Sequence, residues 1–360
     1  MTQNATGVSA RDAVINKVAA VTLRGLPHLP DRVMRLLLGG RSITFDGNTL
    51  DTTMQLMLAG QQALGLDGLV ADDDVATARV HLELLAGSFK KHIPVSAITD
   101  LTVAGAVGPI RARHYRTDEP EAPLLVFYHG GGHVIGSIDT HDDLCRQICR
   151  EGRTHVLSVD YRLALEHPAP AASEDAYAAY VWACEHAAEL GADRQRVAVG
   201  GDSAGGNLAA VVSLRARAEK APLPALQLLF YPMTNIGGQT RSRTLFARGF
   251  FLTRRDIEWF AGRYLDDAQV EGADPRVSPL LADDLSGLPP ALVVTAGFDP
   301  LRDEGRQYAD AMRRAGVPVD YREYGSLVHG FANFFPLGGA SATATAEVIS
   351  AMRAHLTRAR

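Results

Sequence analysis

Cysteine is scarce in this sequence: its 360 residues include three, Cys145, Cys149 and Cys184. So sparse and odd a set does not supply the disulfide framework of a secreted domain, so we expect a reducing, cytoplasmic compartment. Cys145 and Cys149 lie on one face of an expected helix, but no Cys-x-x-Cys pair accompanies them. We therefore interpret them as core packing residues and expect no metal centre.

Basic charge is not in excess, because 36 Lys and Arg face 41 Asp and Glu and leave a net charge of −5. A chain without excess positive charge does not attract the negatively charged phosphate backbone of nucleic acids, so nucleic acid is not an expected partner. No uninterrupted apolar stretch approaches the roughly 18 residues that span a bilayer, so no transmembrane segment is expected. The content of 46% apolar and 21% charged residues predicts an ordinary folded chain.

From about residue 124 onward, short aliphatic runs alternate with longer helical patterns, as in an α/β fold whose mostly parallel sheet is flanked by helices. The expected strands are 124–128, 155–160, 197–200, 226–231, 292–296 and 319–323, with weaker strands between 98 and 115. The expected helices between and after them are 142–150, 171–190, 204–218, 303–315 and 343–358. Because the strands are apolar throughout, both faces of the sheet should be buried.

Two regions of the sequence have helical patterns and no strand run. The first is residues 1–92, with amphipathic patterns at 14–21, 31–38, 52–63 and 75–86. The second is an insertion at about 232–273, with a helical pattern over 257–265. We therefore expect an N-terminal helical extension over 1–92 and a core over 93–360 that this insertion interrupts. Trp259 and Phe260 in the insertion are interpreted as packing residues of its own core rather than as the wall of a substrate pocket.

The N-terminal extension has an apolar face that requires a partner. In its second helix this face consists of Val33, Leu36 and Leu37, and basic residues flank it. The face could pack on the other helices of the two strand-free regions, join a second subunit in a homodimer, or lie on an anionic membrane as a peripheral contact. We favour packing on those helices, because two prolines break the stretch into short helices that suit continuous contact with a membrane poorly.

A G-x-S-x-G sequence, Gly201-Asp202-Ser203-Ala204-Gly205, lies between an expected strand and an expected helix. A serine at such a sharp turn needs glycine on either side, because a side chain there would collide with the neighbouring strand and helix. The hydroxyl of Ser203 is then exposed at the carboxyl end of the sheet. Taken alone, the pentapeptide is also compatible with a plain glycine-rich turn.

A second glycine-rich sequence, His129-Gly130-Gly131-Gly132, directly follows the expected strand 124–128. Consecutive glycines let main-chain amides approach a pocket without side chains in the way, as an oxyanion hole requires. A phosphate-binding loop is the alternative, but the Lys-Ser/Thr ending and the G-x-G-x-x-G spacing are missing. With Ser203 following it in the chain, we interpret this sequence as an oxyanion loop.

A serine hydroxyl is a weak nucleophile at neutral pH, so it needs a histidine base and an acid that orients the base. Asp299 follows the expected strand 292–296, and His329 follows the expected strand 319–323. Both are loop positions at the carboxyl ends of strands, where functional groups of open α/β sheets gather. Asp303 and Glu304 are acidic alternatives, but they occupy the first turn of the next helix, so Asp299 is preferred.

Together these motifs resemble the hormone-sensitive-lipase-like (bacterial family IV) branch of the α/β-hydrolase esterases and lipases. The resemblance extends from about residue 75 to the C-terminus. It includes the segments 160–163, 166–168, 274–280, 296–304 and 329–331. One departure is Leu165, where the family usually has proline; this difference affects the rigidity of a loop rather than the chemistry.

The resemblance implies an α/β-hydrolase fold in which the segment before the sheet and the insertion form a helical cap over the active site. It implies Ser203 as the nucleophile, His329 as the base and Asp299 as the residue that orients the base. The implied oxyanion donors are the backbone amides of Gly131, Gly132 and Ala204. The residues that would support these motifs structurally are His129, Gly130 and Asp202.

The activity implied is hydrolysis of carboxylic esters of short to medium acyl chains, small-molecule substrates, through an acyl-enzyme and without a cofactor. Hydrolysis of amide, formamide or carbamate bonds would use the same residues and remains an alternative. A non-catalytic receptor for small molecules on the same fold is a further alternative. Its marker would be the loss of one of the three catalytic residues, and all three are present.

Overall fold

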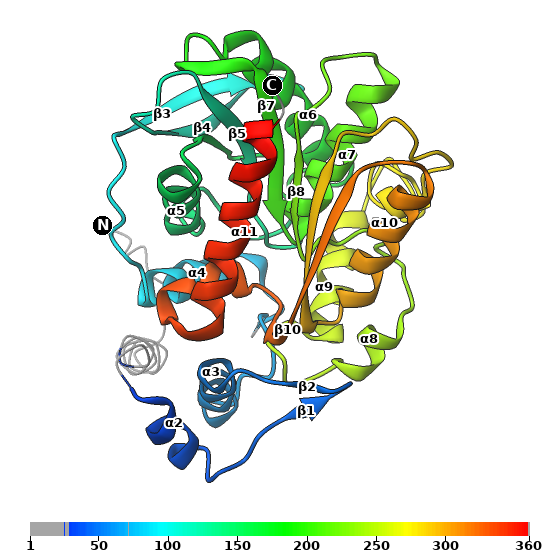
Figure 1. Ribbon diagram of the computed structural model, residues 1–360. Helices are drawn as coiled ribbons and strands as arrows, with labels where there is room; N and C mark the ends of the chain where they lie inside the picture. Colours follow the sequence, from blue (N-terminus) through cyan, green and yellow to red (C-terminus); the bar gives the residue numbers. More distant parts are fainter. Residues whose placement is uncertain (1–24, 26–28, 71, 359–360) are drawn as a thin grey trace, which may run out of the picture.

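The structure is a computed structural model that describes residue 25 and residues 29–70 and 72–358 (Figure 1). Its centre is an eight-stranded sheet with the order β10-β9-β8-β7-β5-β6-β4-β3. The strands are β3 (Ala97–Ala104), β4 (Pro109–Arg116), β5 (Ala122–Tyr128), β6 (His155–Val159), β7 (Ala192–Asp202), β8 (Gln227–Phe230), β9 (Ala291–Phe298) and β10 (Val319–Val328). β4 pairs antiparallel with β3 and β6, and the other neighbours pair parallel. The mostly parallel sheet is thus confirmed, and it contains a strand at each of the six expected positions. The expected burial of both faces is wrong for β10, which is only partly buried from Val319 to Ser326.

Helices cover both faces of this sheet and bury its apolar strands. One face packs against α5 (Asp142–Gly152) and α11 (Gly339–Arg358), and Cys145 and Cys149 are part of that buried core. The other face packs against α6 (Ala171–His186), α7 (Ala204–Ala218) and α10 (Arg302–Arg314). Every residue of β5, β6, β8 and β9 is buried, which is the reason that these strands are continuous apolar runs.

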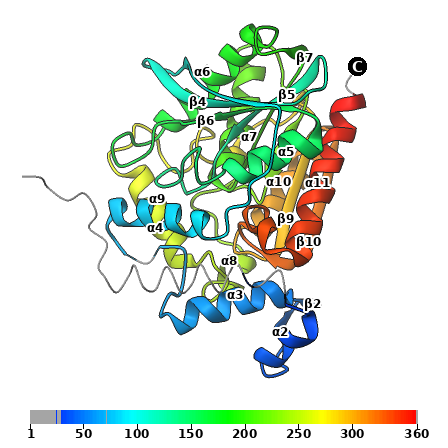
Figure 2. The same cartoon turned by 90° about the vertical axis from the view of Figure 1, so that its left-hand side faces the viewer.

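The remaining helices lie at the carboxyl ends of the parallel strands (Figure 2). A first group lies before the sheet in the chain and consists of α2 (Asp31–Leu37), α3 (Thr52–Ala63) and α4 (Val75–Ser88). A second group lies between β8 and β9 and consists of α8 (Arg241–Leu245), α9 (Arg254–Leu265) and the 3₁₀ turn η2 (Pro279–Leu281). The 3₁₀ turn η3 (Phe331–Leu337) follows β10. The first and second groups are joined directly, because Asp256 in α9 accepts hydrogen bonds from the amides of Leu69 (3.1 Å) and Val70 (3.0 Å). Within the described residues, no helix combines the length and the apolarity needed to cross a bilayer.

The N-terminal region differs from the sequence prediction in two respects. The expected helix at 14–21 lies outside the described residues. In α2 the buried residue is Met34, which packs beside Thr53 of α3, whereas Leu36 and Leu37 are 78% and 63% exposed. The expectation that this apolar face packs on the other helices of the strand-free regions is therefore wrong for Leu36 and Leu37.

The N-terminal region also contains a β-hairpin that the sequence analysis missed. The strands β1 (Thr44–Phe45) and β2 (Asn48–Thr49) pair antiparallel across a two-residue turn. Asp46 and Gly47 in this turn have φ values of 52° and 78°. Asp-Gly is a favoured pair for such a turn, so the dipeptide was a usable signal, although two-residue strands are too short for apolar alternation.

Candidate active site

Ser203 lies on a tight turn between β7 and α7, with φ 57° and ψ −116°. The neighbouring glycines allow the strand and helix to approach each other. A Cβ atom on Gly205 would lie 1.8 Å from the carbonyl oxygen of Tyr128, and one on Gly201 would lie 2.4 Å from the same oxygen. The pentapeptide therefore requires both glycines, and it holds Ser203 in a backbone conformation that is strained for a residue with a side chain.

Ser203, His329 and Asp299 form a continuous chain of contacts at the carboxyl ends of β7, β9 and β10. The Nε2 atom of His329 lies 2.9 Å from the Oγ atom of Ser203, and its Nδ1 atom lies 2.8 Å from the Oδ2 atom of Asp299. The second carboxylate oxygen of Asp299 accepts a 2.7 Å hydrogen bond from the amide of Leu301. Asp299 is fully buried and His329 is 4% exposed, so the pair is shielded from water.

The two acidic alternatives to Asp299 have other partners. Asp303 accepts a 2.8 Å hydrogen bond from the amide of Ser242. Glu304 is fully buried and forms an ion pair with Arg243 at 2.6 Å. Neither carboxylate contacts His329. Instead, both link the start of α10 to the insertion between β8 and β9.

Because Glu304 and Arg243 form a buried ion pair, we expect that removing the charge of Glu304 lowers the stability of the protein strongly. Glu304→Gln would leave the Arg243 guanidinium, 7% exposed, without its charged partner, and we expect a loss of about 3 kcal/mol in the free energy of unfolding. Urea unfolding followed by circular dichroism measures this loss. Glu258→Gln is the control, because it breaks an exposed ion pair with Arg254 and should change stability little. Equal losses in the two variants would contradict the buried-pair explanation.

The loop at residues 129–132, expected to form the oxyanion hole, lines the same cavity as Ser203 with its three glycines. Gly131 and Gly132 have φ values of 117° and 61°, and a Cβ atom on Gly131 would lie 2.1 Å from the carbonyl oxygen of Ile135. Among the hydrogen bonds within the described residues, none uses the amide of Gly131, Gly132 or Ala204 as a donor. Three amides next to the serine are therefore available to a ligand atom.

His129 holds the backbone at the start of this loop. Its Nδ1 atom donates to the carbonyl of Gly130 at 2.8 Å, and its ring stacks on Tyr161 with 4.4 Å between ring centroids. The Tyr161 hydroxyl in turn donates to the carbonyl of His129 at 2.7 Å. Burial, together with the nearby His141, lowers the pKa of His129 to about 3, so the ring is neutral at physiological pH.

Asp202 ties the oxyanion loop to the serine turn. Its buried carboxylate accepts hydrogen bonds from the amide of Gly130 (2.9 Å) and the side chain of Asn333 (3.0 Å), and it lies 3.1 Å from the Nε2 atom of His141. Burial alone would raise its pKa, but His141 and Asn333 hold it below the ordinary value, so Asp202 stays ionised. The sequence analysis did not assign His141 and Asn333 to the site, because their link to Asp202 is formed only by the fold.

A cavity of about 120 Å³ opens beside Ser203 and His329. Its apolar walls come from both strand-free regions and include Leu82, Leu85, Phe89, Phe251, Ile257 and Phe260. Besides Ser203 and His329, the polar side chains that line it are Lys90, His133, Asp139, Thr140, His141, Asp143, Asp202 and Asn333. A small, mainly apolar cavity beside a serine hydroxyl fits a hydrocarbon chain attached to a reactive carbonyl.

Phe260 of α9 lies directly against the oxyanion loop. A Cβ atom on Gly132 would lie 2.2 Å from its ring. The interpretation of Phe260 as a packing residue alone is therefore wrong, because it also lines the cavity. Trp259 has the expected packing role, with its ring edge-on to Phe260 and the guanidinium of Arg263 3.9 Å from its centroid.

Comparison with known proteins identifies the relatives of this chain. Residues 125–333 match the model of a family described as having the alpha/beta hydrolase fold. The carboxylic ester hydrolase LipN of Mycobacterium tuberculosis is 56% identical over 347 residues, which cover 95% of this chain and 92% of that protein. The ethyl acetate hydrolase of Pseudomonas putida is 34% identical and covers 84% of this chain and 97% of its own length.

Solved structures of esterases have the same fold. The structure of an ester hydrolase from the metagenome of Lake Arreo superposes with a TM-score of 0.80 at 40% identity, covering 86% of this chain and 99% of that one. A thermostable esterase from Pseudomonas putida gives a TM-score of 0.81 at 34% identity, with 87% and 99% coverage. The chain therefore belongs to the α/β-hydrolase family, in its hormone-sensitive-lipase-like branch of serine hydrolases.

Proposed function

We propose that this protein hydrolyses carboxylic esters through an acyl-enzyme formed on Ser203. The observation that carries the proposal is the unbroken chain of contacts from Ser203 through His329 to Asp299. Beside it lie an apolar cavity and three amides that donate no hydrogen bond within the part of the chain that the structure describes. A nucleophile, a base and an orienting acid within hydrogen-bond distance of one another are what acyl transfer by serine requires. The ester-hydrolase names of the relatives support the same reaction.

In the acylation step, the Oγ atom of Ser203 attacks the ester carbonyl while Nε2 of His329 takes the hydroxyl proton. Asp299 holds His329 in the tautomer whose Nε2 accepts that proton, and it stabilises the imidazolium that forms. The carbonyl oxygen becomes an oxyanion as the tetrahedral intermediate forms. His329 then gives its proton to the alcohol oxygen, the carbon–oxygen bond breaks, and the acyl group remains on Ser203.

The oxyanion would be held by the amides of Gly131, Gly132 and Ala204. These donors are fixed before the substrate arrives, because Asp202 holds the amide of Gly130 and His129 holds its carbonyl. Preorganised donors of this kind stabilise developing charge without a cost of reorganisation at the moment of reaction. In the second half of the reaction, His329 activates a water molecule that attacks the acyl carbon and frees Ser203.

The cavity predicts a preference for acyl chains of short to medium length, since its volume is small and its walls are mainly apolar. We expect kcat/KM for p-nitrophenyl esters to be highest between acetate and octanoate and to fall toward palmitate. The measurement is initial rates across that series, with the anilides of the preferred acids as amide comparators. Faster hydrolysis of palmitate than of butyrate would contradict the predicted chain length, and faster cleavage of the anilides would contradict ester hydrolysis as the main activity.

A further inference from the structure

The β1–β2 hairpin lies across the ends of the two strands that lead to Asp299 and His329 (Figure 1). β9 ends at Phe298, immediately before Asp299, and β10 ends at Val328, immediately before His329. The hairpin contacts both strand ends, although more than 240 residues separate Thr49 of β2 from Ala291 of β9.

On the β9 side, Phe45 of the hairpin packs against aromatic rings beside the candidate acid. Its ring is edge-on to Phe298, with 6.4 Å between centroids. It makes similar edge contacts with Phe246 at 6.1 Å and Phe250 at 6.0 Å, both from the insertion between β8 and β9. Phe45 therefore fixes the position of the residue that directly precedes Asp299.

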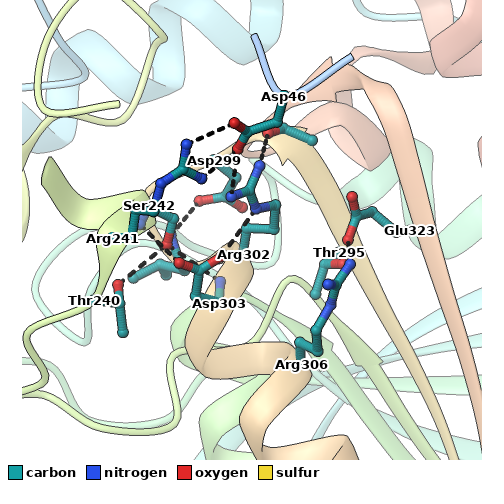
Figure 3. A network of polar contacts seen from close by, with 12 residues as sticks. Asp46, Thr240, Arg241, Ser242, Thr295, Asp299, Arg302, Asp303, Arg306 and Glu323 are labelled. Atoms are coloured by element: carbon teal, nitrogen blue, oxygen red, sulfur yellow. Dashed lines mark hydrogen bonds and ion pairs between the residues drawn. The ribbon is translucent and has the colours of Figure 1, made fainter. Parts of the chain in front are cut away.

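Asp46, at the tip of the hairpin, is ion-paired with two arginines on the same side (Figure 3). Its carboxylate lies 3.2 Å from Arg302 and 2.6 Å from Arg241. Arg302 is the buried partner: it donates its side chain to the carbonyl of Gly297 (3.1 Å) and its amide to the carbonyl of Asp299 (3.1 Å). Hydrogen bonds from Arg241 are the largest cause that lowers the pKa of Asp46, to about 2, so its negative charge persists at physiological pH.

On the β10 side, the hairpin contacts the segment that leads to His329. The pairing of β10 with β9 is interrupted between Tyr324 and Val328. Within that gap, the amide of Asp51 donates to the carbonyl of Ser326 at 2.9 Å. Asn48 fits so closely that a Cβ atom on Gly325 would lie 2.2 Å from its side-chain oxygen. The hairpin and Asp51, which follows it, thus contact β10 where its regular pairing with β9 is interrupted.

From these contacts we infer that the β1–β2 hairpin is a positioning element that sets the geometry between Asp299 and His329. The inference rests on the proposed function, because it assigns the hairpin a role in orienting the proposed base. Phe45 and Asp46 act on the loop that contains Asp299, while Asn48, supported by Asp51 just after the hairpin, acts on the strand that leads to His329. Catalytic groups need support of this kind, since small displacements of a positioned group lower the rate of the chemical step.

Asp46→Asn tests the inference most cleanly. Asparagine tolerates the positive φ of the turn, so the substitution keeps the hairpin and removes the charge that faces Arg302. We expect kcat to fall roughly ten-fold or more at unchanged KM, the kind of loss that a misplaced catalytic group causes. The melting temperature should stay close to that of the parent, because the buried Arg302 keeps its ion pair with Asp303 at 3.0 Å and the pair of Asp46 with Arg241 is exposed.

Two further variants complete the comparison. Asp31→Asn is the control, because it removes a carboxylate that is paired with an exposed arginine, Arg35, at the same distance of 2.6 Å and lies in the same N-terminal region. The Asp31 side chain is 57% exposed and has no contact with Arg302, so the substitution should leave kcat unchanged. Phe45→Ala keeps the charge of Asp46 but removes the packing on Phe298, and it should lower kcat as Asp46→Asn does. Loss of activity in Asp31→Asn to the same degree would overturn the inference.

A second measurement does not depend on turnover. In the Ser203→Ala background, the downfield proton signal of the His329 ring nitrogen that faces Asp299 reports their hydrogen bond. We expect this signal to shift or broaden with Asp46→Asn and to stay in place with Asp31→Asn. An unchanged signal and an unchanged kcat in Asp46→Asn would overturn the positioning role. A parent protein that turned over no ester would instead contradict the proposed function, and the proton signal would still decide the role of the hairpin.

Discussion

Ser203→Ala should leave a folded protein whose kcat for a butyrate ester is lower by about a million-fold, the loss that removal of the nucleophile causes in other serine hydrolases. The fold should persist, because the hydroxyl of Ser203 contacts His329 and makes no other side-chain hydrogen bond within the described residues. Steady-state rates at saturating ester, with thermal unfolding monitored in parallel, measure both quantities. The residual activity would reflect binding and the oxyanion donors alone.

Ser213→Ala is the matched control for that loss. Ser213 is a buried serine of α7, the helix that follows Ser203; its hydroxyl donates to the carbonyl of Ala209 at 2.9 Å, and it does not line the cavity. It should retain the activity of the parent. Undiminished turnover in Ser203→Ala, or an equal loss in Ser213→Ala, would contradict the assignment of the nucleophile.

Asp299→Asn should lower kcat by roughly ten thousand-fold while the protein stays folded. An amide at this position offers its own N–H to Nδ1 of His329, so the ring is held in the tautomer that cannot accept the proton of Ser203. Asp303→Asn serves as the comparison, because Asp303 accepts from the amide of Ser242 and does not contact His329. Its loss should be far smaller. A larger loss for Asp303→Asn than for Asp299→Asn would mean that the orienting acid is misassigned.

The parts of the site that the sequence predicts are those built from local backbone requirements. The turn at Ser203 requires glycine at positions 201 and 205 because the chain passes within contact distance of Tyr128. The loop after β5 requires glycine at 131 and 132 because both have positive φ. Such constraints act within a few residues and therefore leave a readable sequence pattern.

The parts that the sequence did not predict depend on contacts between distant segments. Asn333 donates to Asp202 across 131 positions of the chain, and no local pattern marks it. Phe260 reaches Gly132 from an inserted helix, and its helical spacing is the same whether its ring faces a core or a cavity. The β1–β2 hairpin has only two residues in each strand, which is too few for an alternating pattern to show in the sequence. These residues form strands because they pack against β9 and β10, which the local sequence does not reveal.

Covalent labelling by a fluorophosphonate shows which serine of the protein is the nucleophile. Such a reagent phosphonylates an activated serine and leaves unactivated hydroxyl groups untouched, because reaction requires the base and the oxyanion donors to be in place. The intact parent protein should gain one phosphonyl group, and peptide mass spectrometry should locate it on Ser203, with no labelling of Ser203→Ala. A phosphonyl group on another serine, or no labelling of a parent protein that hydrolyses esters, would contradict the account.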